Sequence, residues 1–309
     1  MNTDLLKKLV EIPGASGDES VIKNFILDYV KAEMQDWVVQ PQIFHGEGFQ
    51  DALVLVFGEP TTAIFAHTDT IGFTVGYDNA LIKIGGPRIL DGIDLVGEDS
   101  QGKFETELLV IENEDGSIST KCVMDRIIDR GTNLTVKPNF RETETSIQSP
   151  YMDNRLGVWV ALEIAKTLEN GALVFSTYEE HGGVSVAFCA KYLYEEYGCR
   201  QALISDITWV TNGVKHNGGV AISLRDSGIP RKKYVDRIVD IASKSDIKYQ
   251  LEVESAGGSD GTALQKSYLP IDWCFIGAPE DHVHTPDEIV HKSDIESMIA
   301  MYELLMREL

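Results

Sequence analysis

Several features are scarce in this 309-residue sequence, and each scarcity argues against a class of protein. Cysteine occurs only at Cys122, Cys189, Cys199 and Cys274, without a Cys-x-x-Cys pair. A disulfide framework and a thiolate zinc site are therefore disfavoured. The longest apolar runs, such as Ala52–Phe57, are far shorter than the ~18 residues that indicate a membrane span. We find no internal repeat and no low-complexity tract.

Basic residues are also scarce. The chain has 27 Lys+Arg against 49 Asp+Glu, so its formal charge is 27 − 49 = −22. Nucleic acids and anionic membranes both require a basic face, so neither is an expected partner. The N-terminus carries Asp4 at once, with no continuous apolar segment behind it, and does not resemble a signal peptide. We therefore expect a cytoplasmic protein.

The chain's pattern predicts an α/β fold. A hydrophobic content of 43% and a charged content of 25% are typical of a globular protein. A short helix is expected near the start, and the polar run Ser16-Gly-Asp-Glu-Ser20 is expected to cap a second helix over Val21–Lys31. Strands alternate with helices on both sides of a central stretch, which implies a sheet with helices on both faces. The expected strands are Ala52–Phe57, Thr62–Ala66, Ala172–Tyr178, Gln201–Ile204, Lys248–Glu252 and Ile271–Ile276; the later helices are Asn154–Leu168, Val184–Tyr197, Lys233–Ser243 and Asp294–Leu309.

The central stretch of the chain has a different sequence pattern. Short β-rich pieces alternate with turn signals such as Asp115-Gly116, and no long helix interrupts them. We interpret residues 73–147 as a small β-rich domain, serving as a lid or in oligomerisation, inserted into one α/β domain made of residues 1–72 and 148–309.

Residues able to bind metal ions follow several predicted strands. His67 and Asp69 follow Thr62–Ala66, and Glu179-Glu180 follow Ala172–Tyr178. In open α/β sheets, ligands bind outside the carboxyl ends of the strands, so parallel strands would bring these side chains to one rim. The remaining candidates are Asp206 after Gln201–Ile204, His282 and His284 after Ile271–Ile276, and Asp153 at a predicted helix start.

Each candidate also has a purely structural interpretation. Asp153 could cap a helix, and Asp206 could be a turn residue. His67 could be a hydrogen-bonded buried histidine, and His282 and His284 could be surface residues. The joint occurrence of these residues favours a metal site over separate structural roles.

His, Asp and Glu without cysteine suit catalytic zinc, cobalt or manganese. The three ligating carboxylates Asp153, Glu180 and Asp206 contribute −3 against +4 from two divalent ions, and a bridging hydroxide completes neutrality. Such a centre lowers the pKa of bound water to around 7. Asp69 is placed to orient the His67 ring. Glu179 remains free as a general base that returns the proton to the leaving amine.

Six ordered segments make the sequence resemble the dinuclear-metal glutamyl and deblocking aminopeptidases, the group that includes the tetrahedral aminopeptidases. They span nearly the whole chain. The segments are His67-Thr-Asp-Thr-Ile-Gly72, Met152-Asp-Asn-Arg-Leu-Gly157, Glu179-Glu-His-Gly182, Ser205-Asp-Ile-Thr208, Gly257-Gly-Ser-Asp-Gly261 and His284-Thr-Pro-Asp-Glu288.

The resemblance implies a zinc-dependent exopeptidase-like fold with a mixed, largely parallel sheet. It also implies that Asp153 bridges two ions, with His67 and Asp206 on one and Glu180 and His284 on the other. His284 is preferred to His282 because the His-Thr-Pro-Asp-Glu run begins there. The resemblance further implies peptide substrates and a homo-oligomer, from a dimer up to a dodecamer. It also assigns the general base to Glu179 and the orienting role to Asp69.

The expected function is metal-dependent removal of N-terminal residues from peptides, with attack by a hydroxide bound to two metal ions. Two alternatives remain open from the sequence. A related dinuclear hydrolase could act on N-acylated amino acids, peptide C-termini or glycans, because fold does not determine substrate. A non-catalytic scaffold is the other.

Overall fold

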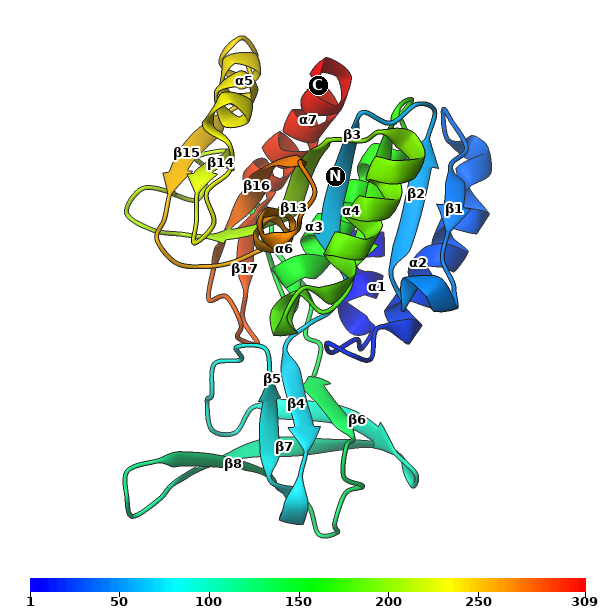
Figure 1. Cartoon of the computed structure of the whole chain (residues 1–309). Helices are drawn as coiled ribbons and strands as arrows, with labels where there is room; N and C mark the ends of the chain where they lie inside the picture. Colours follow the sequence, from blue (N-terminus) through cyan, green and yellow to red (C-terminus); the bar gives the residue numbers. More distant parts are fainter.

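The computed structural model describes residues 1–309 and contains two β-sheets (Figure 1). The larger sheet has eleven strands in the order β1-β2-β12-β3-β13-β16-β17-β11-β10, with β14 beside β16 and β15 beside β14. These strands are β1 (Gln42–Phe44), β2 (Leu53–Phe57), β3 (Thr62–His67), β10 (Arg141–Glu142), β11 (Ser146–Gln148), β12 (Gly171–Ser176), β13 (Gln201–Trp209), β14 (Val220–Arg225), β15 (Tyr249–Val253), β16 (Asp272–Asp281) and β17 (Ile289–His291).

The centre of this sheet is parallel. β12 pairs with β3, β3 with β13, and β13 with β16, all in parallel register, whereas β2, β14 and β17 pair antiparallel with this central group. The prediction of a mixed, largely parallel sheet is confirmed. Because parallel strands end at the same edge, the loops that follow β3 and β12 meet at one rim.

Helices cover both faces of the larger sheet. In β3, Ile64 and Ala66 face one apolar cluster while Ala63 and Phe65 face the other, as the two-residue period of a strand requires. The first cluster packs beneath α1 (Asp4–Glu11), α2 (Ser20–Glu33), α3 (Met152–Ala165), α5 (Lys232–Ser243) and α7 (Lys292–Glu308); the second packs beneath α4 (Val184–Tyr197) and α6 (Asp260–Lys266).

The smaller sheet lies below the larger one in Figure 1 and has its own apolar cluster. Its strand order is β5-β4-β9-β6-β7-β8. The division of the chain at 73–147 stays a prediction. β10 and most of β11 fall within that range, but they pair within the larger sheet. The small-sheet strands are β4 (Gly72–Val75), β5 (Leu81–Ile84), β6 (Asp94–Asp99), β7 (Gly102–Glu112), β8 (Ile118–Cys122) and β9 (Asn133–Val136).

Two predicted strand ends were wrong. β13 continues to Trp209, so Asp206 lies inside the strand and not after it. β16 continues to Asp281, so the turn that carries His284 begins directly at the strand end. Both strands lengthen because they pair with each other over nine residues, from Gln201 with Asp272 onward. A pairing partner is information that a local pattern does not contain.

The predicted cap of the second helix was also wrong. The helix begins at Ser20, and its N-cap residue Glu19 accepts no capping hydrogen bond through its side chain. Ser16 instead donates to Asp69, and Glu19 accepts from the Tyr178 backbone N–H. The polar run therefore connects to the rim of the sheet.

Close contact between α3 and β13 positions the metal-site candidates. Asn154 Nδ2 donates to the Ser205 carbonyl oxygen at 2.9 Å, and Ser205 Oγ donates to the Gly157 carbonyl oxygen at 3.1 Å. A Cβ atom on Gly157 would overlap both Asn154 Oδ1 and the Ser205 carbonyl oxygen. The absence of a side chain at this position lets α3 approach β13, which places Asp153 beside Asp206.

The four cysteines are free and buried, which agrees with the expected lack of a disulfide framework. None of the helices combines the length and the apolar character needed to cross a membrane.

The Gly157→Ala substitution should destabilise the protein by about 1–3 kcal/mol, as expected for a methyl group forced into a packed contact. Gly48→Ala is the control, because a Cβ there meets no atom within 4 Å. It should change the free energy of unfolding by about 0.5 kcal/mol or less. Urea denaturation followed by circular dichroism measures both values. Equal stability of the two variants would contradict the proposed packing.

Candidate metal centre

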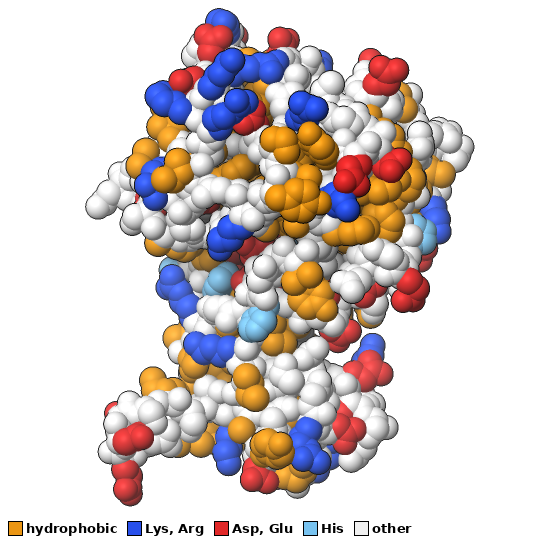
Figure 2. Space-filling model, in the orientation of Figure 1, with side chains coloured by type: hydrophobic (Ala, Val, Ile, Leu, Met, Phe, Trp, Pro, Cys, Tyr) orange, Lys and Arg blue, Asp and Glu red, His pale blue; other side chains and the backbone are white.

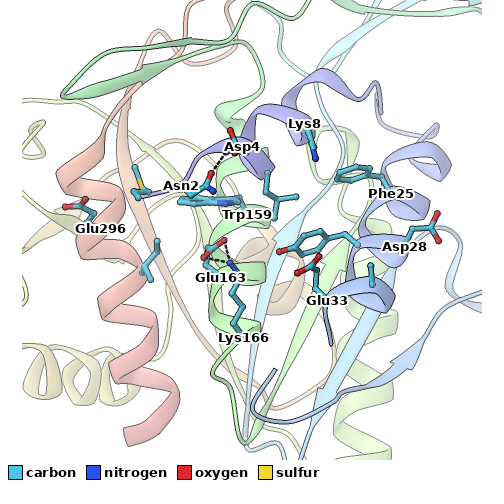
Figure 3. Close-up of a pocket in the computed structure, with 15 residues that line it drawn as sticks. Asn2, Asp4, Lys8, Phe25, Asp28, Glu33, Trp159, Glu163, Lys166 and Glu296 are labelled. Carbon is cyan, nitrogen blue, oxygen red and sulfur yellow. Dashed lines mark hydrogen bonds and ion pairs between the residues drawn. The ribbon is translucent and has the colours of Figure 1, made fainter. Parts of the chain in front are cut away.

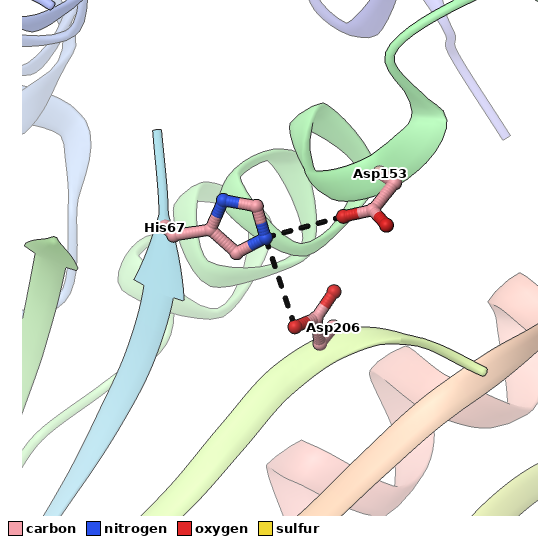
Figure 4. Close-up of side chains that lie close together, drawn as sticks. All are labelled: His67, Asp153 and Asp206. Carbon is pink, nitrogen blue, oxygen red and sulfur yellow. Dashed lines mark hydrogen bonds and ion pairs between the residues drawn. The ribbon is translucent and has the colours of Figure 1, made fainter. Parts of the chain in front are cut away.

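His67 faces two carboxylates from different elements (Figure 4). Its Nε2 atom lies 3.1 Å from Asp153 Oδ1 and 3.7 Å from Asp206 Oδ2. On the other side of the ring, Nδ1 lies 3.2 Å from the Asp69 carbonyl oxygen and 3.3 Å from Asp69 Oδ1. A proton on Nδ1 is thus satisfied by Asp69, which leaves the Nε2 lone pair directed at the two carboxylates.

The second group uses the other oxygen of Asp153. His284 Nε2 lies 3.3 Å from Asp153 Oδ2 and 3.2 Å from Glu180 Oε1. His284 Nδ1 lies 3.0 Å from the carbonyl oxygen of Gly86, in the loop after β5. The two groups with metal-ligand geometry are therefore His67, Asp153, Asp206 and Asp153, Glu180, His284, and neither contains His282.

Asp69 does more than the sequence predicted. Besides contacting His67, it accepts the backbone N–H groups of Glu179 at 3.0 Å and Glu180 at 3.1 Å. Ser16 Oγ donates to Asp69 Oδ2 at 2.6 Å. One buried carboxylate thus connects His67 to the short 3₁₀ turn that presents both glutamates.

Sequence reasoning missed the role of Glu288. This buried carboxylate accepts the backbone N–H of Asp153 at 3.2 Å and that of His284 at 2.9 Å, so it joins two of the segments that carry candidate ligands. Glu288 ends one of the six motif segments, and that was the available signal. Ser16 was missed because its partner is 53 residues away.

Burial and charge shift the pKa values of these groups in opposite directions. The pKa of Glu179 is raised to about 8, chiefly by burial; His67 opposes this rise, and the neighbouring Asp260, Glu180 and Asp153 contribute to it. Burial also raises the pKa of Asp206. The pKa of Asp153 is lowered, because hydrogen bonds from His284 and His67, when these rings are protonated, outweigh its burial.

The donor atoms fit a bound cation. Glu180 Oε1 is buried and accepts no hydrogen bond, although it faces His284 Nε2. When His284 is neutral and carries its proton on Nδ1, directed at Gly86, the facing nitrogen and oxygen atoms are both acceptors. Two acceptors at this separation repel unless a cation lies between them. The set of imidazole and carboxylate donors suits zinc, cobalt or manganese.

Both groups open onto one cavity of about 290 Å³, which Glu179 also lines. Gly86 forms part of its wall, so the smaller sheet's loops contribute to the site. Histidine side chains are visible near the narrow junction of the two sheets in Figure 2. A larger cavity of about 720 Å³ lies around Trp159 between α1, α2, α3 and α7 (Figure 3), and it contains none of the candidate ligands.

A mixed α/β sheet with paired histidine and carboxylate donors at one rim defines a metallohydrolase. The profile of the M42 glutamyl aminopeptidase family matches residues 98–301. Because this match covers more than half of the chain, the protein belongs to that family. It is a metal-dependent aminopeptidase, a hydrolase acting on peptide bonds.

Similar proteins match this chain over nearly its full length. The lysyl aminopeptidase of Pyrococcus furiosus is 22% identical, over 99% of this chain and 97% of that protein. The structure of an aminopeptidase from the archaeon Desulfurococcus kamchatkensis matches with a TM-score of 0.84 and 21% identity, over 99% of this chain and 94% of that one. The TET1 peptidase of Pyrococcus horikoshii matches with a TM-score of 0.81 and 21% identity, over 99% of each chain. These structures confirm the predicted fold.

The contact between the small-sheet loop and Glu180 generates a prediction. Gly85 has a φ of +67°, and a Cβ there would lie 3.0 Å from Glu180 Oε2. We expect Gly85→Ala to displace Glu180 slightly and to lower kcat/KM about 10-fold, less than the ~10²-fold effect of a 1 Å misplacement. Steady-state hydrolysis of an aminoacyl substrate measures this.

Gly92→Ala is the matched control, because Gly92 has a φ of +79° but no atom within 4 Å of the added Cβ. Both substitutions should lower the free energy of unfolding by about 1–2 kcal/mol, since both force a side chain into left-handed backbone. Only Gly85→Ala should lower kcat/KM strongly. Equal activity of the two variants would show that this loop does not position Glu180.

Proposed function

We propose that this aminopeptidase acts through two divalent ions, with zinc as the physiological metal and cobalt or manganese as substitutes. Asp153 would contact both ions. His67 and Asp206 would complete one, and Glu180 and His284 the other. The observation that carries this assignment is that two ligand groups share Asp153 and open onto a single cavity. When bound, such ions polarise the scissile carbonyl and lower the pKa of water.

We assign proton transfer to Glu179. It lines the cavity beside both groups and belongs to neither. A Glu179 oxygen would accept a proton from the attacking water as the water oxygen bonds to the carbonyl carbon. The same oxygen would then deliver that proton to the amine nitrogen as the C–N bond breaks. This leaves a free amino acid and a shortened peptide.

Asp69 would act as a positioning residue. Its contact with His67 Nδ1 would keep Nε2 free to bind an ion. Its bonds to the backbone N–H groups of Glu179 and Glu180 would hold the proposed base and a proposed ligand at a constant separation. Removal of Asp69 would therefore affect metal binding and proton transfer together.

We further propose that the chain forms a homo-oligomer and that the smaller sheet supplies subunit contacts. The TET1 peptidase of Pyrococcus horikoshii can assemble into a tetrahedron or a large octahedral shell. In the present chain, large apolar side chains of the small-sheet region are exposed, and exposed apolar groups favour contact with another protein. They include Tyr77, Ile82, Leu90, Ile118 and Ile127.

Replacing Glu179 tests the proton-transfer assignment. Glu179→Ala should lower kcat by roughly 10²–10⁴-fold, the range for loss of a general base, while the metal content stays near that of the unaltered protein. Asp153→Asn is the comparison variant and should reduce metal content as well as activity. Turnover on an aminoacyl substrate and elemental analysis of the purified proteins give the two readouts. Full activity of Glu179→Ala would refute the assignment.

Light scattering during size-exclusion chromatography tests the assembly. The full chain should elute as a multiple of the 34.2 kDa subunit. Lysine at both Ile82 and Ile118 should shift it to smaller species, because buried charges oppose association. Ile229→Lys is the control, since Ile229 is similarly exposed but lies between β14 and α5, outside the smaller sheet. A monomeric unaltered chain would contradict the proposal.

A further inference from the structure

The cavity beside the metal centre carries a second set of acidic residues. Asp226, Glu252 and Glu254 line it together with the candidate ligands. No lysine or arginine is among the residues that line this cavity. A substrate side chain entering it therefore meets a region of negative charge with no fixed basic partner.

The topology of two strands gathers these three acids. β14 and β15 pair in parallel, with Ser223 opposite Glu252, and the backbone N–H of Glu254 donates to the Arg225 carbonyl oxygen at 3.0 Å. Asp226 directly follows β14, so it lies at the same strand end as Glu254. The carboxyl ends of parallel strands are where α/β sheets bind ligands.

The three acids of the second set influence one another. Burial raises the pKa of Glu252, hydrogen bonds with Thr208 and Ser223 oppose this rise, and the charges of Glu254 and Asp226 add to it. Burial likewise raises the pKa of Asp226, which the Arg225 charge opposes. The Arg225 Nε–H, however, donates to the Asp226 carbonyl oxygen, and Arg225 does not line the cavity.

Apolar groups line the same cavity as the two acidic sets. They are Ile207, Trp209, Phe275 and Val283. Lysine and arginine side chains have an apolar stem and a charged end, so they pack their methylene groups on such walls while the charge meets carboxylates. An aromatic face near a cation adds to this attraction.

We propose that this cavity selects peptides whose N-terminal residue is lysine or arginine, with Asp226, Glu252 and Glu254 receiving the cationic end of that side chain. This rests on the proposed function, because it requires the scissile bond to lie at the metal centre. The cavity disfavours an N-terminal glutamate, since like charges repel strongly in a partly buried site. The glutamyl preference suggested by the family description then does not extend to this chain.

A panel of Lys-, Arg-, Leu- and Glu-p-nitroanilides, assayed separately with zinc, cobalt and manganese, tests the proposal. We expect kcat/KM for the lysyl substrate to exceed that for the leucyl substrate by roughly 10-fold, as expected from hydrogen bonds to a charged group. The glutamyl substrate should be the poorest of the four. A glutamyl preference, or equal rates for lysyl and leucyl substrates, would overturn the proposal.

Neutral variants test whether the cavity acids bind the cationic side chain. Glu254→Gln and Glu252→Gln should each lower the ratio of lysyl to leucyl kcat/KM about 10-fold, because each removes one charge and keeps the side-chain shape. Glu114→Gln is the control, since Glu114 is exposed on the distant β7–β8 hairpin and should leave the ratio unchanged. An unchanged ratio in both cavity variants would refute the role of these acids.

The outcomes also separate this inference from the function on which it rests. If no aminoacyl substrate is hydrolysed with any metal, the proposed function fails. If the leucyl substrate is hydrolysed without a lysyl preference, only the specificity proposal fails. Circular dichroism of each variant shows whether a lost preference reflects unfolding.

Discussion

The candidate site depends on a cluster of buried hydrogen-bond acceptors around Asp153 that lacks matching donors. Each oxygen of this carboxylate faces an imidazole nitrogen, and each imidazole has its other nitrogen directed at a carbonyl oxygen of the chain. Asp206 and Glu180 add further negative charge to the same small volume. Burying charge without compensation is costly, and bound cations would supply that compensation.

Several long-range contacts hold these acceptors in place. α3 approaches β13 at Gly157, which brings Asp153 to Asp206. Asp69 joins His67 to the glutamate turn, and Glu288 joins the backbone of Asp153 to that of His284. Removing one of these links would leave a buried donor unpaired while the ligands move apart. Hydrogen bonds to two carboxylates that are not among the candidate ligands thus join the backbone segments of the centre.

The same fold separates chemistry from selection. Segments at the carboxyl rim of the central strands supply the candidate metal ligands, whereas β14 and β15 at the side supply a second set of acids. The overall charge of −22 says nothing about this division, because most carboxylates lie on the surface, where solvent screens them. Only acids that share a desolvated cavity can discriminate between substrate side chains.

Local patterns in the sequence determined much of this protein. The continuous apolar residues of Thr62–Ala66 indicated a strand, and the histidines and carboxylates that follow such strands indicated a metal site. The choice between His282 and His284 rested on a motif, and spacing alone did not distinguish them. Tertiary structure decided how far β13 and β16 extend, because strand length depends on the pairing partner.

Tertiary structure also decided which groups share one cavity. Ser16 contacts Asp69, and Asp226 lines the same cavity as Glu252, although the members of each pair are distant in the chain; no local period encodes such pairs. The reason is physical: backbone periodicity shows which face a side chain occupies, but only the packed sheet determines what lies opposite it.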